Sequence, residues 1–431
     1  VDEYAKRWIA FGWHAIVVDG HDIGALLKAL EEARRTKNRP TMIVARTLKG
    51  KGVSIFEGLD NWHGKALKKG EQADRAVAEL EARLTAGLVT PKIPSPSALP
   101  AETMQPANDA NVLTPQYDTD AKVATRKAYG SALATLGAVD QRVVALDADV
   151  SNSTFSNAFE EAHGARFYQT FIAEQAMVGA AMGLASRGAI PFPSTFACFL
   201  SRAYDFIRMA GISNLNIKLA GSHAGVSIGE DGPSQMALED LAMMRAVPNC
   251  TVLYPCDAMS TERLVMAAAA HKGMVYIRTT RPATPVIYGA DEKFEIGGSK
   301  VIRDAPLAVA TIVAAGITVF EALKASDELL EAGTPIRVID AYSIEPVDVA
   351  TLVDSARQTG NALITVEDHY VNGGLGDAVS AAVGALGIQV HRLAVKDIPR
   401  SGQPDELFDR YGISTAHIVA TVRRLIDSST S

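Results

Sequence analysis

Apolar residues recur along this chain with two different spacings, and their alternation predicts strands and helices in turn. A continuous apolar run at 15–18 is typical of a buried strand, and leucines at helical spacing behind Asp22, a candidate N-cap, predict a helix over 22–37. Another apolar run at 41–45 predicts a second strand. This order of elements favours a parallel sheet, and we expect its earlier strands upstream of Val1.

The same alternation returns twice after residue 120. A helix through residue 138 leads into further apolar runs, which predict strands at 143–146, 217–220, 251–253 and 275–277. Helical patterns between these strands imply parallel pairing, and ligands bind beyond the carboxyl ends of such strands. The architecture repeats after residue 303, with a helix at 319–332 and strands at 307–314, 336–339 and 362–366.

A proline-rich stretch separates the first of these regions from the second. It holds neither period and indicates an interdomain linker over 89–120, with Pro91, Pro94, Pro96, Pro100, Pro106 and Pro115. We therefore predict an α/β fold of three domains with mainly parallel sheets, over 1–88, 121–303 and 304–431, the first of them truncated. The length of 431 residues agrees with this number, at roughly 100–200 residues per domain.

Composition and charge exclude several classes of protein. With 48% hydrophobic and 21% charged residues the chain is globular, and its net charge of −7 includes no basic block that would follow a nucleic acid. No apolar run approaches the ~20 residues of a membrane helix, and no signal peptide opens the chain. Three cysteines without metal-binding spacing fit a reducing compartment, so we predict a cytoplasmic protein with no nucleic-acid or membrane partner.

Polar residues gather at the ends of apolar runs in three segments, 171–188, 194–209 and 221–240. Glu174 begins a very apolar helix, where poor solvation would suit it to share a proton. Taken alone, it is better explained as a first-turn glutamate favoured by the helix dipole. His223 and Asp231 lie in a glycine-rich stretch that either binds sugar hydroxyls or forms an ordinary loop. Phe196 and Phe199 either offer a flat surface to an aromatic ring or belong to the core.

Candidate anion-binding residues are spread more widely along the chain. Arg126 and Arg281 can hold a phosphate by bidentate hydrogen bonds, although the default interpretation of each is a surface arginine. Lys49 in TLKGKG and His63 in NWHGK are ambiguous in the same way, since a lysine between glycines can meet an anionic group. The residues alone therefore indicate an α/β protein with a pocket for a small, anionic, polyhydroxylated ligand.

Taken together and in order, these segments resemble transketolases over essentially the whole chain. TLKGKG and NWHGK resemble the end of that family's diphosphate-binding domain. Its pyrimidine-binding domain is similar to ATRKAYG, NSTFS, FIAEQAMV, STFACF, GSHAGVSIGEDGPSQMALEDLAMMR and RTTRP, and its C-terminal domain to VEDHYVNGGLG and IPRSG. The long GEDGPSQMALED string, with IAEQ upstream of it, is the most specific part of the resemblance.

The resemblance implies a role for each candidate residue. Glu174 would hydrogen-bond N1′ of the aminopyrimidine of thiamine diphosphate, and His63 and His223 would act with it in catalysis. The other cofactor contacts would come from Lys49 and His63 near the diphosphate, from Phe199 stacked on the pyrimidine, and from Gln235. The sugar phosphate would be held by His63, Arg126, Ser153, His223, Asp231 and Arg281. Gln235 resembles the animal form of the family, because many bacterial, yeast and plant relatives have a histidine there.

The reaction that the resemblance implies is reversible transfer of a two-carbon ketol group through a carbanion of thiamine diphosphate. The donor would be a ketose phosphate such as xylulose 5-phosphate, and the acceptor an aldose phosphate such as ribose 5-phosphate or erythrose 4-phosphate. The enzyme would be a homodimer with the cofactor at the subunit interface.

One family motif is absent from the sequence: the GDG…N motif, whose Asp and Asn hold Mg²⁺ on the diphosphate. We expect the metal ligands upstream of Val1, and we expect the chain as given to be incomplete for activity. Two alternatives remain open. One is a related thiamine-dependent enzyme, such as deoxyxylulose-phosphate synthase or the β chain of a 2-oxoacid dehydrogenase. The other is a non-catalytic, truncated homologue that acts as a binding partner.

Overall fold

The computed structural model describes residues 1–84, 117–118 and 121–429. The chain divides into two compact units, Val1–Ala98 and Leu99–Ser431. Of the linker that we predict at 89–120, all but Tyr117 and Asp118 lies outside the described residues.

The first unit is a strand–helix–strand motif with two additional helices. Strand β1 (His14–Asp19) pairs in parallel with β2 (Thr41–Arg46), and α2 (Ile23–Arg35) connects them. Helix α1 (Asp2–Ala10) precedes this motif and α3 (Glu71–Glu81) follows it. The predicted order of elements and the parallel pairing are confirmed.

The cap predicted for α2 is also present, because the Asp22 carboxylate accepts a hydrogen bond from the Ala25 amide at 3.0 Å. One face of the helix, however, stays uncovered within the unit. Ile23, Leu27 and Leu30 follow one another at helical spacing and are 69%, 61% and 58% exposed. Two strands are too few to cover such a face, and parallel sheets normally have both faces covered. The first unit by itself therefore does not bury the apolar side of its long helix.

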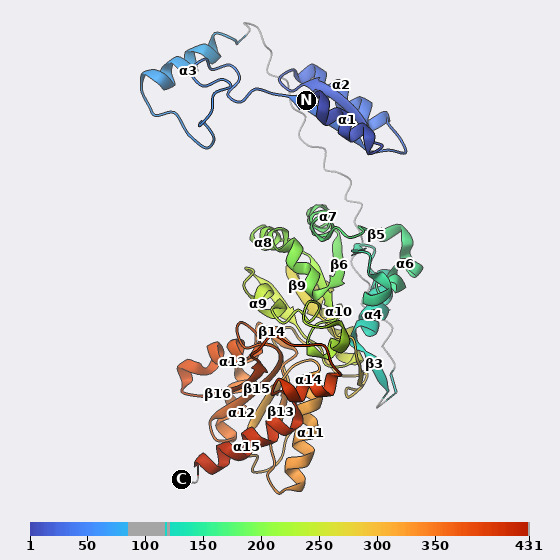
Figure 1. Cartoon of the computed structure of the whole chain (residues 1–431), viewed down its shortest axis with the longest axis vertical. Coiled ribbons are helices and arrows are strands. Elements are labelled where there is room, and N and C mark those ends of the chain that lie inside the picture. The colour runs from blue at the N-terminus through green and yellow to red at the C-terminus, as the bar shows by residue number, and fades with distance from the viewer. Residues whose placement is uncertain (85–116, 119–120, 430–431) are drawn as a thin grey trace. The chain divides into compact units, whose positions relative to one another are not determined.

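The second unit is built on two sheets (Figure 1). The strands of the larger sheet are β4 (Val143–Asp147), β5 (Phe167–Gln169), β6 (Ile190–Phe196), β7 (Lys218–Ser222), β8 (Cys250–Leu253), β9 (Met274–Arg278) and β14 (Ser343–Glu345). They lie in the order β14-β8-β9-β7-β6-β4-β5, and every neighbouring pair is parallel except β14 with β8. The predicted parallel pairing is confirmed here as well.

The smaller sheet has five strands, β11 (Lys300–Arg303), β12 (Thr311–Ala314), β13 (Arg337–Asp340), β15 (Ala362–Tyr370) and β16 (Gln389–Val395). Their order is β11-β13-β12-β15-β16, and only β11 is antiparallel to its neighbour. A separate antiparallel pair is formed by β3 (Lys122–Ala124) and β10 (Ala283–Pro285).

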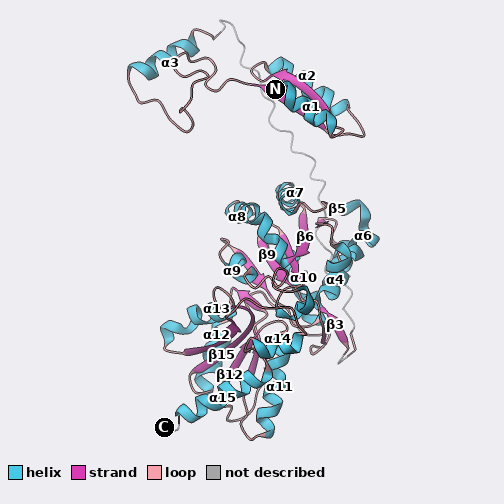
Figure 2. Cartoon of the chain, viewed as in Figure 1, coloured by secondary structure: helices cyan, strands magenta, loops and turns pink. Residues whose placement is uncertain are grey.

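Helices surround both sheets (Figure 2). Those that follow the strands of the larger sheet are α4 (Thr125–Val139), α5 (Ser151–Thr154), α6 (Asn157–His163), α7 (Glu174–Ser186), α8 (Tyr204–Ile212), α9 (Asp240–Arg245) and α10 (Ala258–Ala270). Those of the smaller sheet are α11 (Thr318–Glu331), α12 (Val349–Gln358), α13 (Leu375–Val383), α14 (Pro404–Arg410) and α15 (Thr415–Ser429). Short 3-10 segments are η2 (Gly164–Arg166), η3 (Ala197–Ala203), η4 (Val226–Asp231) and η5 (Gly384–Leu386).

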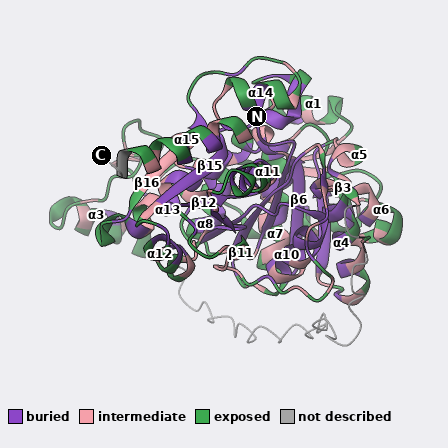
Figure 3. Ribbon diagram, turned by 90° about the horizontal axis from the view of Figure 1, so that it is seen from below, coloured by how far each residue is buried: buried purple, intermediate pink, exposed green. Residues whose placement is uncertain are grey.

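The core of the second unit lies in the strands, which Figure 3 shows in the colour of buried residues at β6, β12 and β15. One edge strand joins the two sheets. β14 follows β13 of the smaller sheet along the chain but pairs with β8 of the larger sheet. The two halves of the second unit, one around each sheet, are therefore linked by backbone hydrogen bonds.

One predicted strand is wrong in its first half. The apolar run at 307–314 becomes extended only at Thr311, where β12 begins. Leu307 is 91% exposed with φ 64°, and the Ala308 amide donates to the Ala305 carbonyl at 3.2 Å. Residues 306 and 307 form a turn, which an apolar run alone does not reveal.

Candidate functional site

Side chains from four strand ends meet at one edge of the larger sheet. β4, β6, β7 and β9 are parallel, so their carboxyl ends lie on the same side. Phe196 is the last residue of β6, His223 follows β7 directly, and Arg281 comes three residues after β9. Ser153 lies on α5, which follows β4. The predicted residues of the central domain are therefore brought together where ligands bind in open α/β sheets.

His223 is held tightly at this edge and is only 4% exposed. Its backbone has φ 60°, its Nδ1 lies 2.9 Å from the Ser222 hydroxyl, and its ring stacks on Phe196 with centroids 3.9 Å apart. Burial lowers the pKa of His223 to about 3, with further lowering from the positive charges of Arg126 and Arg281. The imidazole is therefore neutral at physiological pH and offers one ring nitrogen as a hydrogen-bond donor and the other as an acceptor.

Two arginines point their charges toward this histidine. Arg126, the second residue of α4, donates from Nη1 to the Ser153 carbonyl at 2.7 Å, while its buried Nε has no hydrogen-bond partner within the part of the chain that the structure describes. Arg281 donates from Nη1 to the Ile228 carbonyl at 3.2 Å and to Asp231 Oδ1 at 3.3 Å. Burial lowers the pKa of Arg126, and repulsion from Arg281 lowers it further. Two cations that act on the same buried imidazole favour an anionic ligand beside them.

Glu174 is the first residue of α7 and is 3% exposed, which confirms its predicted place at the start of an apolar helix. Arg202 Nε lies 3.0 Å from Glu174 Oε2, and the arginine side chain itself is 65% exposed. The contact is an ion pair without hydrogen-bond alignment, because Oε2 has no hydrogen-bond partner among the described residues. A buried carboxylate oxygen is thus left able to bind a donor that approaches from outside the chain.

Phe199 continues the aromatic surface toward this carboxylate. Its ring stacks on Phe196 with centroids 5.3 Å apart and planes 2° from parallel, and it is half-buried. Both rings flank or lie on η3, the segment that also carries Arg202 and packs against α7. Both rings are half-buried, and the same segment contacts Glu174 through Arg202. Gln235 is half-buried beyond η4, and its side-chain carbonyl accepts a hydrogen bond from the Ser234 hydroxyl.

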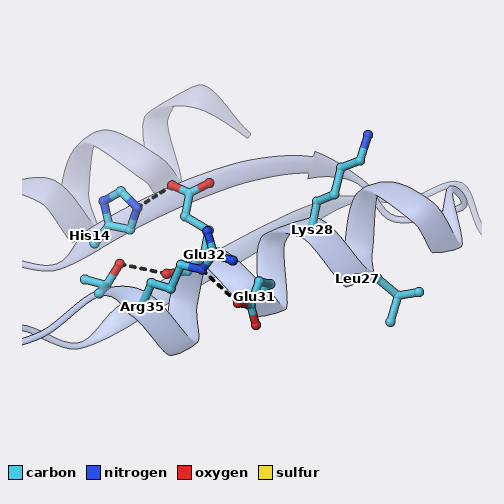
Figure 4. Close-up of a pocket in the computed structure, with 7 residues that line it drawn as sticks. His14, Leu27, Lys28, Glu31, Glu32 and Arg35 are labelled. Atoms are coloured by element: carbon cyan, nitrogen blue, oxygen red, sulfur yellow. Dashed lines mark hydrogen bonds and ion pairs between the residues drawn. The ribbon is translucent and has the colours of Figure 1, made fainter.

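Lys49 and His63 lie in the first unit, where Lys49 Nζ is 2.9 Å from His63 Nδ1 and both residues are exposed. The structure thus joins these two predicted residues to each other. A hollow of about 740 Å³ in the same unit, shown in Figure 4, contains neither of them. It is lined by paired charges, with His14 against Glu32 and Arg35 against Glu31.

Two kinds of feature are absent from the described residues. Residues 1–84, 117–118 and 121–429 hold no group of three or more His, Cys, Asp or Glu side chains placed to bind a metal ion. Within the same ranges, none of the helices has both the length and the apolar character that crossing a membrane requires.

Two contacts of this site were not predicted from the sequence. Arg202 pairs with Glu174, and Phe196 stacks on His223. The one sequence signal for Arg202 is a basic residue three positions after Phe199 in an otherwise apolar stretch. The stack joins residues 27 positions apart, and no local pattern indicates it.

The chain is similar to three domain families over nearly all of its described length. Residues 1–83 match the transketolase thiamine diphosphate binding domain, 121–286 the transketolase pyrimidine binding domain, and 299–418 the transketolase C-terminal domain.

Similar whole proteins include transketolase-like protein 2 of Mus musculus, 52% identical over 97% of this chain and 67% of that protein. Transketolase of Mus musculus is 48% identical over 99% of this chain and 68% of that protein. A solved structure described as a split gene transketolase, inactive beta4 tetramer, is 42% identical with a TM-score of 0.65. That similarity covers 70% of this chain and 98% of the other.

Proposed function

The chain belongs to the transketolase family, and from that premise we propose that it takes part in reversible transfer of a two-carbon ketol group between sugar phosphates. The donor is a ketose phosphate such as xylulose 5-phosphate, and the acceptor an aldose phosphate such as ribose 5-phosphate or erythrose 4-phosphate. The observation that carries the proposal is the meeting of Arg126 and Arg281 with a buried, neutral His223 at the carboxyl edge of the larger sheet, where the two guanidinium groups repel each other. A phosphate relieves this repulsion, and the neutral histidine forms a hydrogen bond with a sugar hydroxyl.

The residues at the start of α7 fit thiamine diphosphate. Oε2 of Glu174, which is ion-paired with Arg202 but accepts no hydrogen bond from the described residues, suits a ring nitrogen that carries a proton. The half-buried ring of Phe199 suits stacking on a pyrimidine. When bound, the cofactor supplies a nucleophilic carbon for attack on a ketose carbonyl. In this proposal Glu174 holds and returns the proton at the pyrimidine nitrogen, Phe199 orients the ring, and Gln235 lies near it.

The substrate residues divide between phosphate and hydroxyl groups. Arg126 and Arg281 bind the phosphate with Ser153 beside them, because Arg126 contacts the Ser153 carbonyl and the two guanidinium groups repel each other. His223 and Asp231 bind sugar hydroxyls, and the neutral state of His223 lets it accept a hydrogen bond from one of them.

We further propose that Lys49 and His63 meet the diphosphate end of the cofactor, with His63 reaching the substrate as well. Their contact at 2.9 Å supports a shared site in the first unit. The exposed residues Ile23, Leu27 and Leu30 support packing of further diphosphate-domain structure on α2. We expect that further structure to hold Mg²⁺.

We propose that a second copy of the chain buries the region around Glu174. Phe171 and Ile172, just before α7, are 67% and 72% exposed, and Ala176 and Ala180 are exposed on the helix itself. A helix that is apolar all round is normally buried. Burial of this face in a dimer would exclude water from the Glu174 carboxylate, as proton sharing with the cofactor requires.

The experiment is a coupled assay of the polypeptide as it occurs in its cell, whether or not that is longer than these 431 residues. With thiamine diphosphate and Mg²⁺ we expect turnover of xylulose 5-phosphate with ribose 5-phosphate, and none when pyruvate is the donor. Glu174→Gln should lower kcat by roughly 10²–10⁴-fold, because an amide cannot pass the proton. Its unfolding midpoint should stay near that of the wild type. A near-normal rate in a folded Glu174→Gln variant, or preference for pyruvate, would refute the assignment.

One specific observation favours a second candidate function. The split gene transketolase chain, of which 98% is covered by the similarity, is described as inactive. On this alternative the 431-residue chain binds sugar phosphate but turns over only after it associates with a separate diphosphate-domain polypeptide. Turnover by the chain alone would exclude this candidate, and binding of ribose 5-phosphate without turnover would support it.

A further inference from the structure

The loop that carries His223 and Asp231 has a backbone that few sequences can adopt. His223, Gly225, Gly229 and Gly232 have φ values of 60°, 90°, 75° and 79° within ten residues. Such conformations cost energy, and for a non-glycine residue they persist only where the surroundings fix them. The loop therefore needs contacts that hold it in place.

Those contacts come largely from the smaller-sheet half of the second unit. A Cβ built on Gly225 would lie 1.8 Å from Asp368 Oδ2, and one on Gly232 would lie 2.7 Å from Ser401 Oγ. Similarly, a Cβ on Gly229 would lie 3.1 Å from the Gly402 carbonyl. Three glycines of the loop thus each face an atom that arrives from beyond residue 367.

Asp368 is the most constrained of these partners. It lies on β15, is 0% exposed, and accepts hydrogen bonds from Tyr254 Oη at 3.1 Å and from Arg278 Nη1 at 2.8 Å. Arg278, also 0% exposed, donates in addition to both carboxylate oxygens of Asp240. The guanidinium therefore joins the two halves of the second unit through two buried carboxylates.

Arg278 is also close in the chain to Arg281, which we propose binds the phosphate. It ends β9, and Arg281 follows three residues later. Between them, the Thr279 carbonyl accepts the Ala224 amide at 3.3 Å, and the Thr279 amide donates to Gly221 at 2.9 Å. Asp368 thus touches the His223 loop at Gly225 and the Arg281 segment at Arg278.

We propose that Asp368 is a positioning residue of the sugar-phosphate site: through Gly225 and Arg278 it fixes the distance between His223 and Arg281. The proposal rests on the sugar-phosphate function proposed above. It gives the C-terminal part of the chain a role in substrate binding although none of the proposed substrate-binding residues lies in that part. A ligand held by two groups on separate segments binds weakly when those segments shift, because displacements of about 1 Å can cost two orders of magnitude.

The test compares Asp368→Asn with a matched control, Glu367→Gln. Glu367 is the preceding residue of β15 and is 3% exposed, but its carboxylate accepts from the Leu375 and Gly376 amides at the start of α13. Both variants replace a buried carboxyl group on the same strand by an amide of nearly the same shape. Calorimetry with ribose 5-phosphate gives the Kd, and hydrogen–deuterium exchange follows peptides over 221–240 and 278–282.

In Asp368→Asn we expect the Kd for ribose 5-phosphate to rise at least about tenfold and amide exchange over 221–240 to accelerate by a similar factor. In Glu367→Gln the Kd and the amide exchange rate over 221–240 should both stay within about twofold of the wild type. This should hold even if the unfolding midpoint of this variant falls as much as that of Asp368→Asn. A folded Asp368→Asn variant with wild-type exchange over 221–240 overturns the inference, and so does equal loss of affinity in the control.

The proposed function and the proposed role of Asp368 can be refuted independently. Wild-type chain that does not bind ribose 5-phosphate removes the proposed function, while the exchange measurement still decides whether Asp368 holds the loop. If Asp368→Asn does not fold, Gly225→Ala perturbs the same contact from the other side. A folded Gly225→Ala variant with unchanged affinity and unchanged exchange over 221–240 overturns the inference as well.

Discussion

His223 should make the folded chain lose stability as the pH falls, and the size of this effect follows from its surroundings. The imidazole is 4% exposed and faces two guanidinium groups, so that burial first, and then Arg126 and Arg281, lower its pKa from 6.5 to about 3. In the unfolded chain the same residue titrates at its ordinary value. Between these two pKa values only the unfolded state binds the proton.

Proton linkage gives the direction of this stability change and the pH range in which it occurs. A depressed histidine pKa means that the unfolded chain holds more protons, so stability rises with pH through the range from about 3 to 6.5. Relative to neutral pH, this single group should cost about 2 kcal/mol at a pH of about 5. The loss should continue to grow until the pH reaches the folded-state value.

The assay is urea unfolding of the wild type and of His223→Gln at pH values of about 7.5 and 5, followed by far-ultraviolet circular dichroism. Tryptophan fluorescence is unsuitable, because Trp8, Trp13 and Trp62 all lie in the first unit. Each protein is compared with itself at the two pH values, so a constant effect of the substitution cancels.

We expect the wild type to lose about 2 kcal/mol more than the variant over this interval. Inorganic phosphate should narrow the gap, because an anion between the arginines offsets their repulsion of the imidazolium. The reasoning is refuted if both proteins lose the same stability, since His223 would then not be held neutral by its site.

Two further predictions concern neighbouring groups. Arg126→Met should leave the unfolding midpoint unchanged or raise it, because it removes a repelled cation and a buried Nε without a described partner. The same variant should bind phosphate at least about tenfold more weakly by titration calorimetry, and unaltered phosphate affinity would argue against a phosphate site at Arg126. Burial raises the pKa of Cys198 and Cys250 to about 12 and that of Cys256 well above its ordinary value. Mass spectrometry should therefore find all three cysteines unalkylated by iodoacetamide at a pH of about 8 until urea is added, and rapid labelling of the folded chain would contradict this.

Local pattern in the sequence was enough to predict most of the framework. The apolar runs that become β4 and β15, and the N-cap Asp22, depend on residues close together in the chain, so periodicity and capping chemistry indicate them directly. The same kind of signal failed at Leu307, where an apolar residue belongs to an exposed turn. The position of Glu174 at the start of an apolar helix was likewise predictable from its immediate neighbours.

The chemistry of the site depends on neighbours that the sequence keeps far apart. No window contains both Arg126 and Arg281, yet their repulsion is part of what keeps His223 neutral. Arg278 and Asp368 are 90 positions apart and meet without water access. Desolvation and Coulomb interactions depend on distance through space and on what excludes the solvent. The sequence by itself thus determined the elements and the residue types at their ends, whereas only the tertiary structure decided which charges face one another and how deeply they are buried.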